Sequence, residues 1–265
     1  MREPLGPGDV WRTPERPSAA WRRLLPSLGF YAPTLRIVFR SSWLAARGRY
    51  GDAEWVEASR GIQEAMEATG ARCEVSGLDT LRNLDGPAVI VGNHMSTLET
   101  FLLPGMVRPF RPVTFVVKQS LVKVPVFGPV MRSRDPVVVG RRDARSDFQA
   151  ILQGGKAHLD KGMSIIVFPQ TTRTPVFQTR QFNSIGVKLA RAAKVPVIPL
   201  ALRTDAWPLG KPWKDLARIR PERPIRFAFG PAMTLEGAGK AEQTRVVAFI
   251  ADHLREWGAP VEDGR

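Results

Sequence analysis

Six short apolar runs, separated by longer segments with helical patterns, constrain the fold of this chain more than any other feature. The runs are Ala88–Val91, Thr114–Val117, Val137–Val139, Ile165–Phe168, Val197–Ala201 and Ile225–Phe229. The other segments predict helices at Thr97–Val107, Ala144–Lys161, Ser184–Ala193 and Ala241–Trp257. Strands that are apolar on both faces are typical of parallel sheets covered by helices. We therefore predict an α/β fold with a mostly parallel central sheet flanked by helices, and we expect ligands beyond the carboxyl ends of its strands.

The first 70 residues follow a different pattern. Residues 1–20 contain four prolines and predict a loose leader, and residues 52–69 predict a helix. We therefore divide the chain into an N-terminal leader and helical region, residues 1–70, and an α/β domain, residues 71–265.

Within the N-terminal region, residues 21–50 mix arginines with aliphatic and aromatic side chains such as Trp21, Phe39 and Trp43. This composition is typical of a helix that lies in the lipid interface. It would also suit a helix whose apolar face packs on the body of the protein, and both interpretations stay open. No apolar stretch reaches the roughly 20 residues that a membrane-spanning helix needs. The sequence therefore predicts a peripheral protein without a transmembrane helix.

The formal net charge of +14 implies an anionic partner, which could be nucleic acid, an anionic membrane surface or a phosphorylated substrate. Residues 161–204 hold seven basic side chains and no acidic one. We expect no nucleic acid partner, because aromatic residues make up only 8% of the chain and do not interleave with this basic run. The single cysteine, Cys73, excludes an intrachain disulfide and a cysteine-built zinc site.

His94 is the strongest candidate for catalysis. It follows the predicted strand Ala88–Val91 and precedes a predicted helix, and Glu99 stands five residues later. Two residues five apart lie about 140° apart around a regular helix. They can meet only if His94 precedes the helix and Glu99 reaches back from it. The carboxylate would then hold one ring nitrogen and leave the other free as a base. Read alone, this pattern would favour a capping or core histidine.

A second polar segment, Phe168-Pro169-Gln170-Thr171-Thr172-Arg173-Thr174, follows the predicted strand Ile165–Phe168. It places hydroxyl groups and one arginine at another strand end. The planar guanidinium group of arginine suits a phosphate. Read alone, this segment could also be an ordinary polar turn.

The order of these motifs resembles the glycerolipid acyltransferase family, typified by bacterial 1-acylglycerol-3-phosphate acyltransferases. Four blocks over about residues 85–205 match the family's order and spacing. They are Asn93, His94 and Glu99; Lys118, Leu121, Pro125 and Gly128; Phe168 to Thr174; and Val195 to Pro199.

The resemblance implies a reaction. An acyltransferase of this kind moves a fatty-acyl group from acyl-CoA or acyl-carrier protein to the hydroxyl of 1-acyl-sn-glycerol 3-phosphate, giving phosphatidic acid. His94 would remove the hydroxyl proton, and Glu99 would orient the imidazole and stabilise its charge. No metal ion or bound cofactor is implied, because the acyl thioester is a substrate. The reaction would take place at the cytoplasmic face of the cell membrane, on lysophospholipid in an anionic surface.

The resemblance also implies residues that bind the acceptor. Arg173 and Lys118 would hold its phosphate, and Thr172 would help to shape the pocket. The predicted substrate-binding residues are Asn93, Lys118, Gln170, Thr171, Thr172 and Arg173.

Three residues depart from the family pattern. Glu99 replaces an aspartate, so a carboxylate survives. Gln170 replaces a glutamate and removes a charge, and Thr171 replaces a glycine and adds a side chain. Because these two changes fall where the acceptor head group should lie, another lysolipid is an alternative to lysophosphatidic acid. A relative that binds lipid without turnover is a further alternative.

Overall fold

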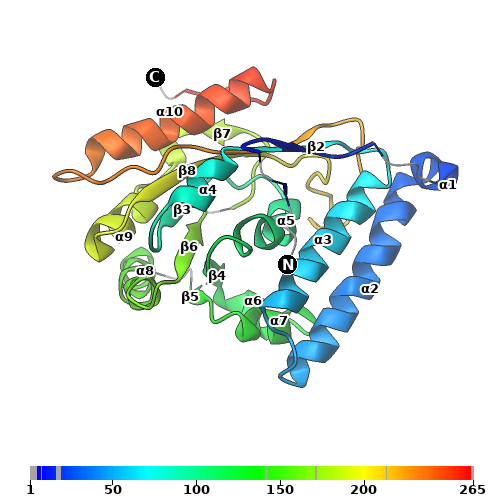
Figure 1. Cartoon of the computed structure of the whole chain (residues 1–265), viewed down its shortest axis with the longest axis horizontal. Helices are drawn as coiled ribbons and strands as arrows, with labels where there is room; N and C mark the ends of the chain where they lie inside the picture. The colour runs from blue at the N-terminus through cyan, green and yellow to red at the C-terminus, as the bar shows by residue number, and fades with distance from the viewer. Residues whose placement is uncertain are drawn as a thin grey trace.

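The central sheet of the computed structural model is mostly parallel. The structure describes residues 5–6, 8–15, 19–140, 143–170, 172–212 and 214–263. Within these ranges the sheet has eight strands in the order β1-β2-β9-β8-β3-β6-β4-β5, and β7 and β10 form a separate pair (Figure 1). The strands are β1 (Trp11–Arg12), β2 (Cys73–Ser76), β3 (Val89–Gly92), β4 (Val113–Lys118), β5 (Val137–Val139), β6 (Ser164–Val167), β7 (Phe177–Gln178), β8 (Val197–Arg203), β9 (Ile225–Phe229) and β10 (Val261–Glu262).

The strand pairing confirms the predicted fold class. Over the described residues, every neighbouring pair in the large sheet is parallel except β1–β2 and β8–β9. All six predicted strands are present, with small shifts at their ends. Strands β3 and β6 lie in the middle of the sheet and are buried on both faces, which is why their residues are continuously apolar.

Helices cover both faces of the sheet (Figure 1). α5 lies on one face, and α8, α9 and α10 pack on the other. The predicted helices after residue 70 are present, with ends moved by a few residues. The helices are α1 (Ala20–Leu24), α2 (Pro26–Ala46), α3 (Asp52–Glu67), α4 (Leu78–Asn83), α5 (Leu98–Val107), α6 (Gln119–Lys123), α7 (Phe127–Ser133), α8 (Ala144–Leu159), α9 (Ile185–Ala193) and α10 (Lys240–Glu256), with a 3₁₀ turn at Thr179–Gln181.

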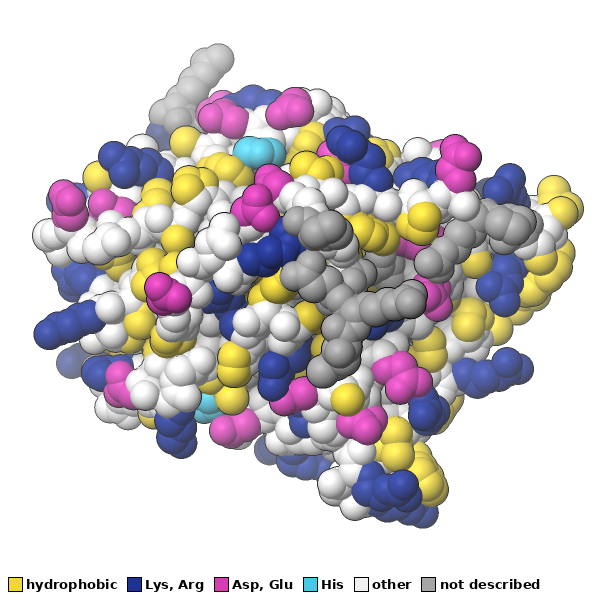
Figure 2. Space-filling view, in the orientation of Figure 1, with side chains coloured by type: hydrophobic (Ala, Val, Ile, Leu, Met, Phe, Trp, Pro, Cys, Tyr) yellow, Lys and Arg dark blue, Asp and Glu magenta, His cyan; other side chains and the backbone are white. Residues whose placement is uncertain are grey.

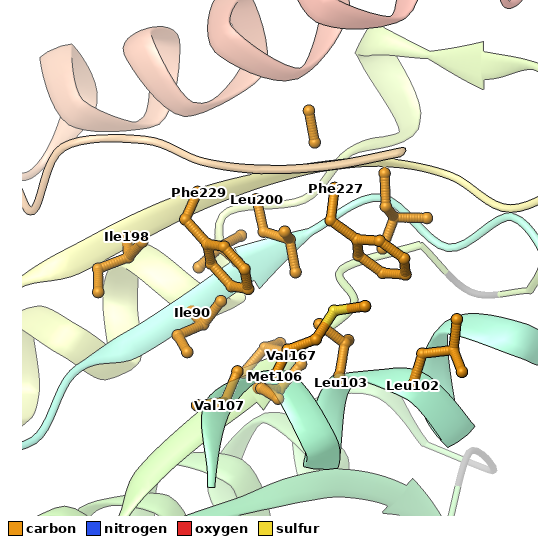
Figure 3. Packing of buried hydrophobic residues seen from close by; sticks show 14 of the residues in the cluster. Ile90, Leu102, Leu103, Met106, Val107, Val167, Ile198, Leu200, Phe227 and Phe229 are labelled. Atoms are coloured by element: carbon orange, nitrogen blue, oxygen red, sulfur yellow. The ribbon is translucent and has the colours of Figure 1, made fainter. Parts of the chain in front are cut away.

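The layer between α5 and the sheet is the part of the core that bears most directly on function. Leu103 and Met106 of α5 lie against Ile90, Phe227 and Phe229 of the strands (Figure 3), and all five side chains are buried. Burying one such side chain stabilises a fold by about 1.5–3 kcal/mol. This packing fixes α5 on the sheet, and so fixes the loop of residues 93–97 that joins β3 to α5.

The described part of the leader is more ordered than we predicted. Trp11 and Arg12 form β1, which pairs with β2, and Arg12 Nε lies 2.7 Å from the Glu74 carboxylate. The prediction of a loose leader is therefore wrong for these residues. The strand pairing offsets the weak local preference of a proline-rich segment.

Helices α2 and α3 form an outer layer on the α5 side of the sheet, because α3 packs on α5 and α2 packs on α3 (Figure 1). One face of α2 is buried through Phe30 and Val38. The opposite face exposes Leu28, Leu35, Phe39 and Trp43, here called the outer stripe. Helix α2 therefore packs on the body and still presents apolar side chains to solvent.

Hydrophobic side chains gather along the edge where α1 and α2 lie, with basic side chains among them (Figure 2). Among the described helices, none combines the length and apolarity needed to cross a bilayer.

Candidate active site

The fold brings the two polar segments together. β3 and β6 are parallel neighbours, with Val91 opposite Val167, so the residues that follow them emerge at the same sheet edge. The ring of His94 stacks on the ring of Phe168, with centroids 4.5 Å apart and planes 7° apart. The Thr174 backbone N–H donates to the His94 carbonyl at 3.0 Å. Both motifs therefore contribute to one site.

His94 and Glu99 make the contact that their spacing predicts. α5 begins at Leu98, so His94 lies in the loop before it and Glu99 reaches back from its first turn. His94 Nδ1 lies 2.9 Å from Glu99 Oε1. When Nδ1–H donates to this carboxylate, Nε2 is left without a proton and can act as a base. The His94 side chain is 16% exposed, whereas Glu99 is fully buried.

Glu99 is surrounded by hydrogen-bond donors. Oε1 accepts from the backbone N–H groups of Met95 and Ser96 at 2.7 and 2.8 Å, and Oε2 accepts from the hydroxyls of Ser96 and Thr204 at 2.9 and 2.6 Å. Burial alone would raise the pKa of Glu99, but the hydrogen bonds from His94, Thr204 and Ser96 hold the pKa below its ordinary value. The carboxylate is therefore ionised at neutral pH and faces the imidazole as an anion.

Asn93 and Gln170, which we predicted to bind substrate, contact the protein backbone in this structure. The Asn93 amide bonds to the Leu202 N–H and C=O, each at 2.9 Å, which extends the β3–β8 pairing by one residue. Gln170 Oε1 accepts from the His94 N–H at 2.6 Å. Both side chains are buried. Asn93 and Gln170 therefore hold the His94 backbone in place, and their contact with substrate stays a prediction.

Arg173 lies on the same side of the site as the start of α5. Its Nη1 donates to Thr97 Oγ1 and to the carboxylate of Asp215. Thr97 is the residue before α5, three positions after His94. The predicted phosphate-binding residue is therefore close to the predicted base in the fold.

The other predicted binding residues are less constrained. Thr172 is exposed beside Arg173. Lys118 ends β4 with an exposed side chain, and β6 separates this strand from β3. The hydrogen bonds of the described residues do not connect Lys118 to His94 or Arg173. Thr171 lies outside the described residues.

The block that begins at Lys118 ends at Gly128, and the fold explains why a glycine stands there. A Cβ at this position would lie 2.6 Å from the Val122 carbonyl oxygen, so only glycine permits the close approach of α7 to α6. The motif therefore shapes the turn after Lys118.

Comparison with known proteins places the chain in a family. A family model described as acyltransferase matches residues 72–203. A 1-acyl-sn-glycerol-3-phosphate acyltransferase of Pseudomonas aeruginosa is 32% identical over 188 residues, which cover 71% of this chain and 68% of that protein. The chain belongs to the acyltransferase family.

Two further comparisons show how far the likeness extends. A chloroplastic 1-acyl-sn-glycerol-3-phosphate acyltransferase of Arabidopsis thaliana is 29% identical over 131 residues, 49% of this chain but only 36% of that protein. The structure of an acyltransferase from Thermotoga maritima, PlsC, matches with a TM-score of 0.65 at 22% identity, over 91% of this chain and 98% of that chain. It has the same fold.

The family match contains all four blocks but ends before Thr204 and Asp215. These two residues reach Glu99 and Arg173 from the segment after β8, about 100 and about 40 positions away in the chain. Their local sequence contains no pattern that indicates a site. Sequence reasoning missed them for this reason.

Proposed function

We propose that this chain is a 1-acylglycerol-3-phosphate acyltransferase, which transfers a fatty-acyl group to lysophosphatidic acid and forms phosphatidic acid. The observation that supports this function best is the pairing of His94 with a buried, ionised Glu99 near Arg173. The acyl group arrives as a thioester of CoA or of acyl-carrier protein, and no resident cofactor takes part.

The proposed reaction follows from the His94 geometry. Nε2 takes the proton of the acceptor hydroxyl while the hydroxyl oxygen attacks the thioester carbonyl, and a tetrahedral oxyanion forms. The imidazolium is stabilised by the Glu99 anion at Nδ1. Collapse of the intermediate breaks the C–S bond, and the proton on Nε2 goes to the departing thiolate. No acyl-enzyme is formed.

The acceptor is held by its phosphate. In lysophosphatidic acid the free hydroxyl is on the carbon next to the one that bears the phosphate ester. Thr97 links Arg173 to the loop of His94, so a phosphate on the guanidinium would place that hydroxyl near Nε2. In the proposal, Lys118, Thr171 and Thr172 also contribute to binding the acceptor.

An acyl-transfer assay tests the proposed function. Purified protein is given long-chain acyl-CoA, or acyl-carrier protein loaded with the same chain, and a set of acceptors. The acceptors are lysophosphatidic acid, a zwitterionic lysolipid, monoacylglycerol and glycerol 3-phosphate. We expect turnover with lysophosphatidic acid. Turnover only with another lysolipid would reassign the acceptor, and silence with every donor and acceptor would favour a lipid-binding protein without turnover.

We further propose that the protein acts as a peripheral protein on the cytoplasmic face of the cell membrane, where anionic lipids attract basic residues. The outer stripe of α2 is apolar and lies beside Arg36 and Arg40. α2 also packs on α7, which with α6 exposes Leu121, Val124 and Phe127. These adjoining surfaces suit insertion into the acyl boundary of the bilayer.

The double variant Leu35→Glu/Phe39→Glu is expected to bind anionic vesicles at least about 100-fold more weakly than the wild-type protein. Each exposed side chain would contribute about 1.5–3 kcal/mol when buried in lipid. Vesicle flotation measures this. Val138→Glu, a similar change at an exposed valine of edge strand β5, serves as the control and should bind normally. Unchanged binding of the double variant would show that the outer stripe does not contact lipid.

A further inference from the structure

Arg173, the proposed phosphate anchor, already has an anionic partner within the chain. Asp215 lies in the segment between β8 and β9, and its Oδ1 accepts from Arg173 Nη1. Thr97 Oγ1 donates to the same oxygen at 2.5 Å and also accepts from Arg173. A carboxylate therefore lies on the guanidinium group where the acceptor's phosphate is expected.

The backbone at Asp215 and on its C-terminal side is held in place. Trp207 Nε1 donates to the Asp215 carbonyl at 3.3 Å. The Tyr31 hydroxyl donates to the Ala217 carbonyl at 2.8 Å, and the Ile219 N–H donates to Ser27 Oγ at 3.1 Å. The last two contacts tie Ala217 and Ile219 to α2. The carboxylate is thus presented to Arg173 by a fixed segment.

Because Asp215 is negatively charged, it can compete with a phosphate group for Arg173. Burial tends to raise the pKa of Asp215, but Arg173, Thr97 and Lys214 together hold the pKa below its ordinary value. It is therefore an anion at neutral pH. Its side chain is 57% exposed, whereas that of Arg173 is 20% exposed. The carboxylate can swing into water, while the guanidinium stays in the site.

We propose that Asp215 competes with the phosphate group of the acceptor and of the product for Arg173. Both lipids must displace the Asp215 carboxylate before their phosphate can bind. This inference rests on the proposed function, because it assigns the phosphate to Arg173. A phosphate monoester can displace a carboxylate because it has a greater charge and three free oxygens.

The competition has a consequence for turnover. Phosphatidic acid retains the phosphate of lysophosphatidic acid, so an arginine without a competitor would hold the product as firmly as the substrate. Asp215 weakens the binding of both by the same factor. It therefore raises the KM for the acceptor and the inhibition constant of the product together, and so makes release of the product easier.

The test compares Asp215→Asn with the wild-type protein. We expect the KM for lysophosphatidic acid and the inhibition constant of phosphatidic acid each to fall by up to about fivefold, since a partly exposed ion pair is worth at most roughly 1 kcal/mol. Calorimetric titration with glycerol 3-phosphate should show a similar gain in affinity. Asp252→Asn, which removes an exposed Asp–Arg pair on α10, should change none of these values.

The same Asp215 substitution in a protein that lacks Arg173 separates competition for Arg173 from a general effect of the substitution. In Arg173→Gln protein, adding Asp215→Asn should give no gain, because the group under competition is absent. Equal or higher KM and inhibition constants in Asp215→Asn, or a gain that persists without Arg173, would overturn the proposal. If no acyl transfer is found but glycerol 3-phosphate still binds more tightly to Asp215→Asn in an Arg173-dependent way, the proposed function fails and the competition stands.

Discussion

The His94→Ala variant is expected to transfer acyl groups about 10²–10⁴-fold more slowly than the wild-type protein, which is the range that a positioned general base contributes. Without the imidazole, nothing at this position takes the proton from the acceptor hydroxyl, and Glu99 keeps its other donors without reaching the substrate. The loss should appear mainly in kcat, because Arg173 and its surroundings still hold the acceptor. Initial rates with lysophosphatidic acid and long-chain acyl-CoA measure it.

Two controls make this result specific. His253→Ala removes another histidine, one that packs between the rings of Phe249 and Trp257 on α10, and should retain normal rates. Circular dichroism should show the same fold for both variants, because the His94 ring lies at the sheet edge on Phe168. Normal turnover by His94→Ala would refute the mechanism even if the enzyme activity were real.

The central strands could be predicted because burial on both faces leaves a continuous apolar run, as in Val89 to Val91. β2 was missed for the opposite reason. Its residues alternate, with Cys73 and Val75 buried and Glu74 and Ser76 partly exposed. Four alternating residues give too weak a local signal, and the strand is fixed by its partner β9 instead.

The site shows the same division between local and distant information. His94 and Glu99 are five positions apart, so helix geometry alone restricts how they can meet. Ser96 is inside that segment, but a serine near a helix start is too common to indicate contact with a carboxylate. Thr204 and Asp215 reach the site only because β8 lies beside β3 and its following segment crosses the sheet edge. That arrangement depends on strand order, which local periodicity does not encode.

The role of α2 could not be resolved from sequence because both of its faces are apolar. A single apolar face would have pointed to the core, and periodicity would have identified it. Here Phe30 and Val38 lie on one face of the helix, and Leu35 and Phe39 lie on the opposite face. The pattern therefore fits packing and lipid contact equally well. The structure shows which side chains are buried, and the vesicle experiment addresses the others.

Replacing Glu99 with glutamine is expected to reduce activity by about 10²–10⁴-fold while preserving the shape of the side chain. A neutral amide cannot stabilise the imidazolium, and its NH₂ group would face donors wherever it is placed, because both carboxylate oxygens accept hydrogen bonds. Glu99→Asp keeps the charge but is one methylene shorter than the gap it must span. We expect it to lose about tenfold, so that its rate lies between those of the other two proteins.

The pH dependence of the free energy of unfolding, compared between the wild-type protein and Glu99→Gln, tests whether the fold holds Glu99 as an anion. The folded-state pKa of Glu99 is below its ordinary value near 4.5, so the folded state favours the ionised form. This contribution to the free energy of unfolding is therefore fully present above pH 4.5 and is lost as the pH falls through the folded-state pKa. The wild-type protein should unfold at a higher urea concentration than Glu99→Gln at neutral pH, and the difference should shrink in acid. A difference that instead moves in favour of the wild-type protein as the pH falls would mean that Glu99 is protonated in the fold, and His94 would then lack its anionic partner.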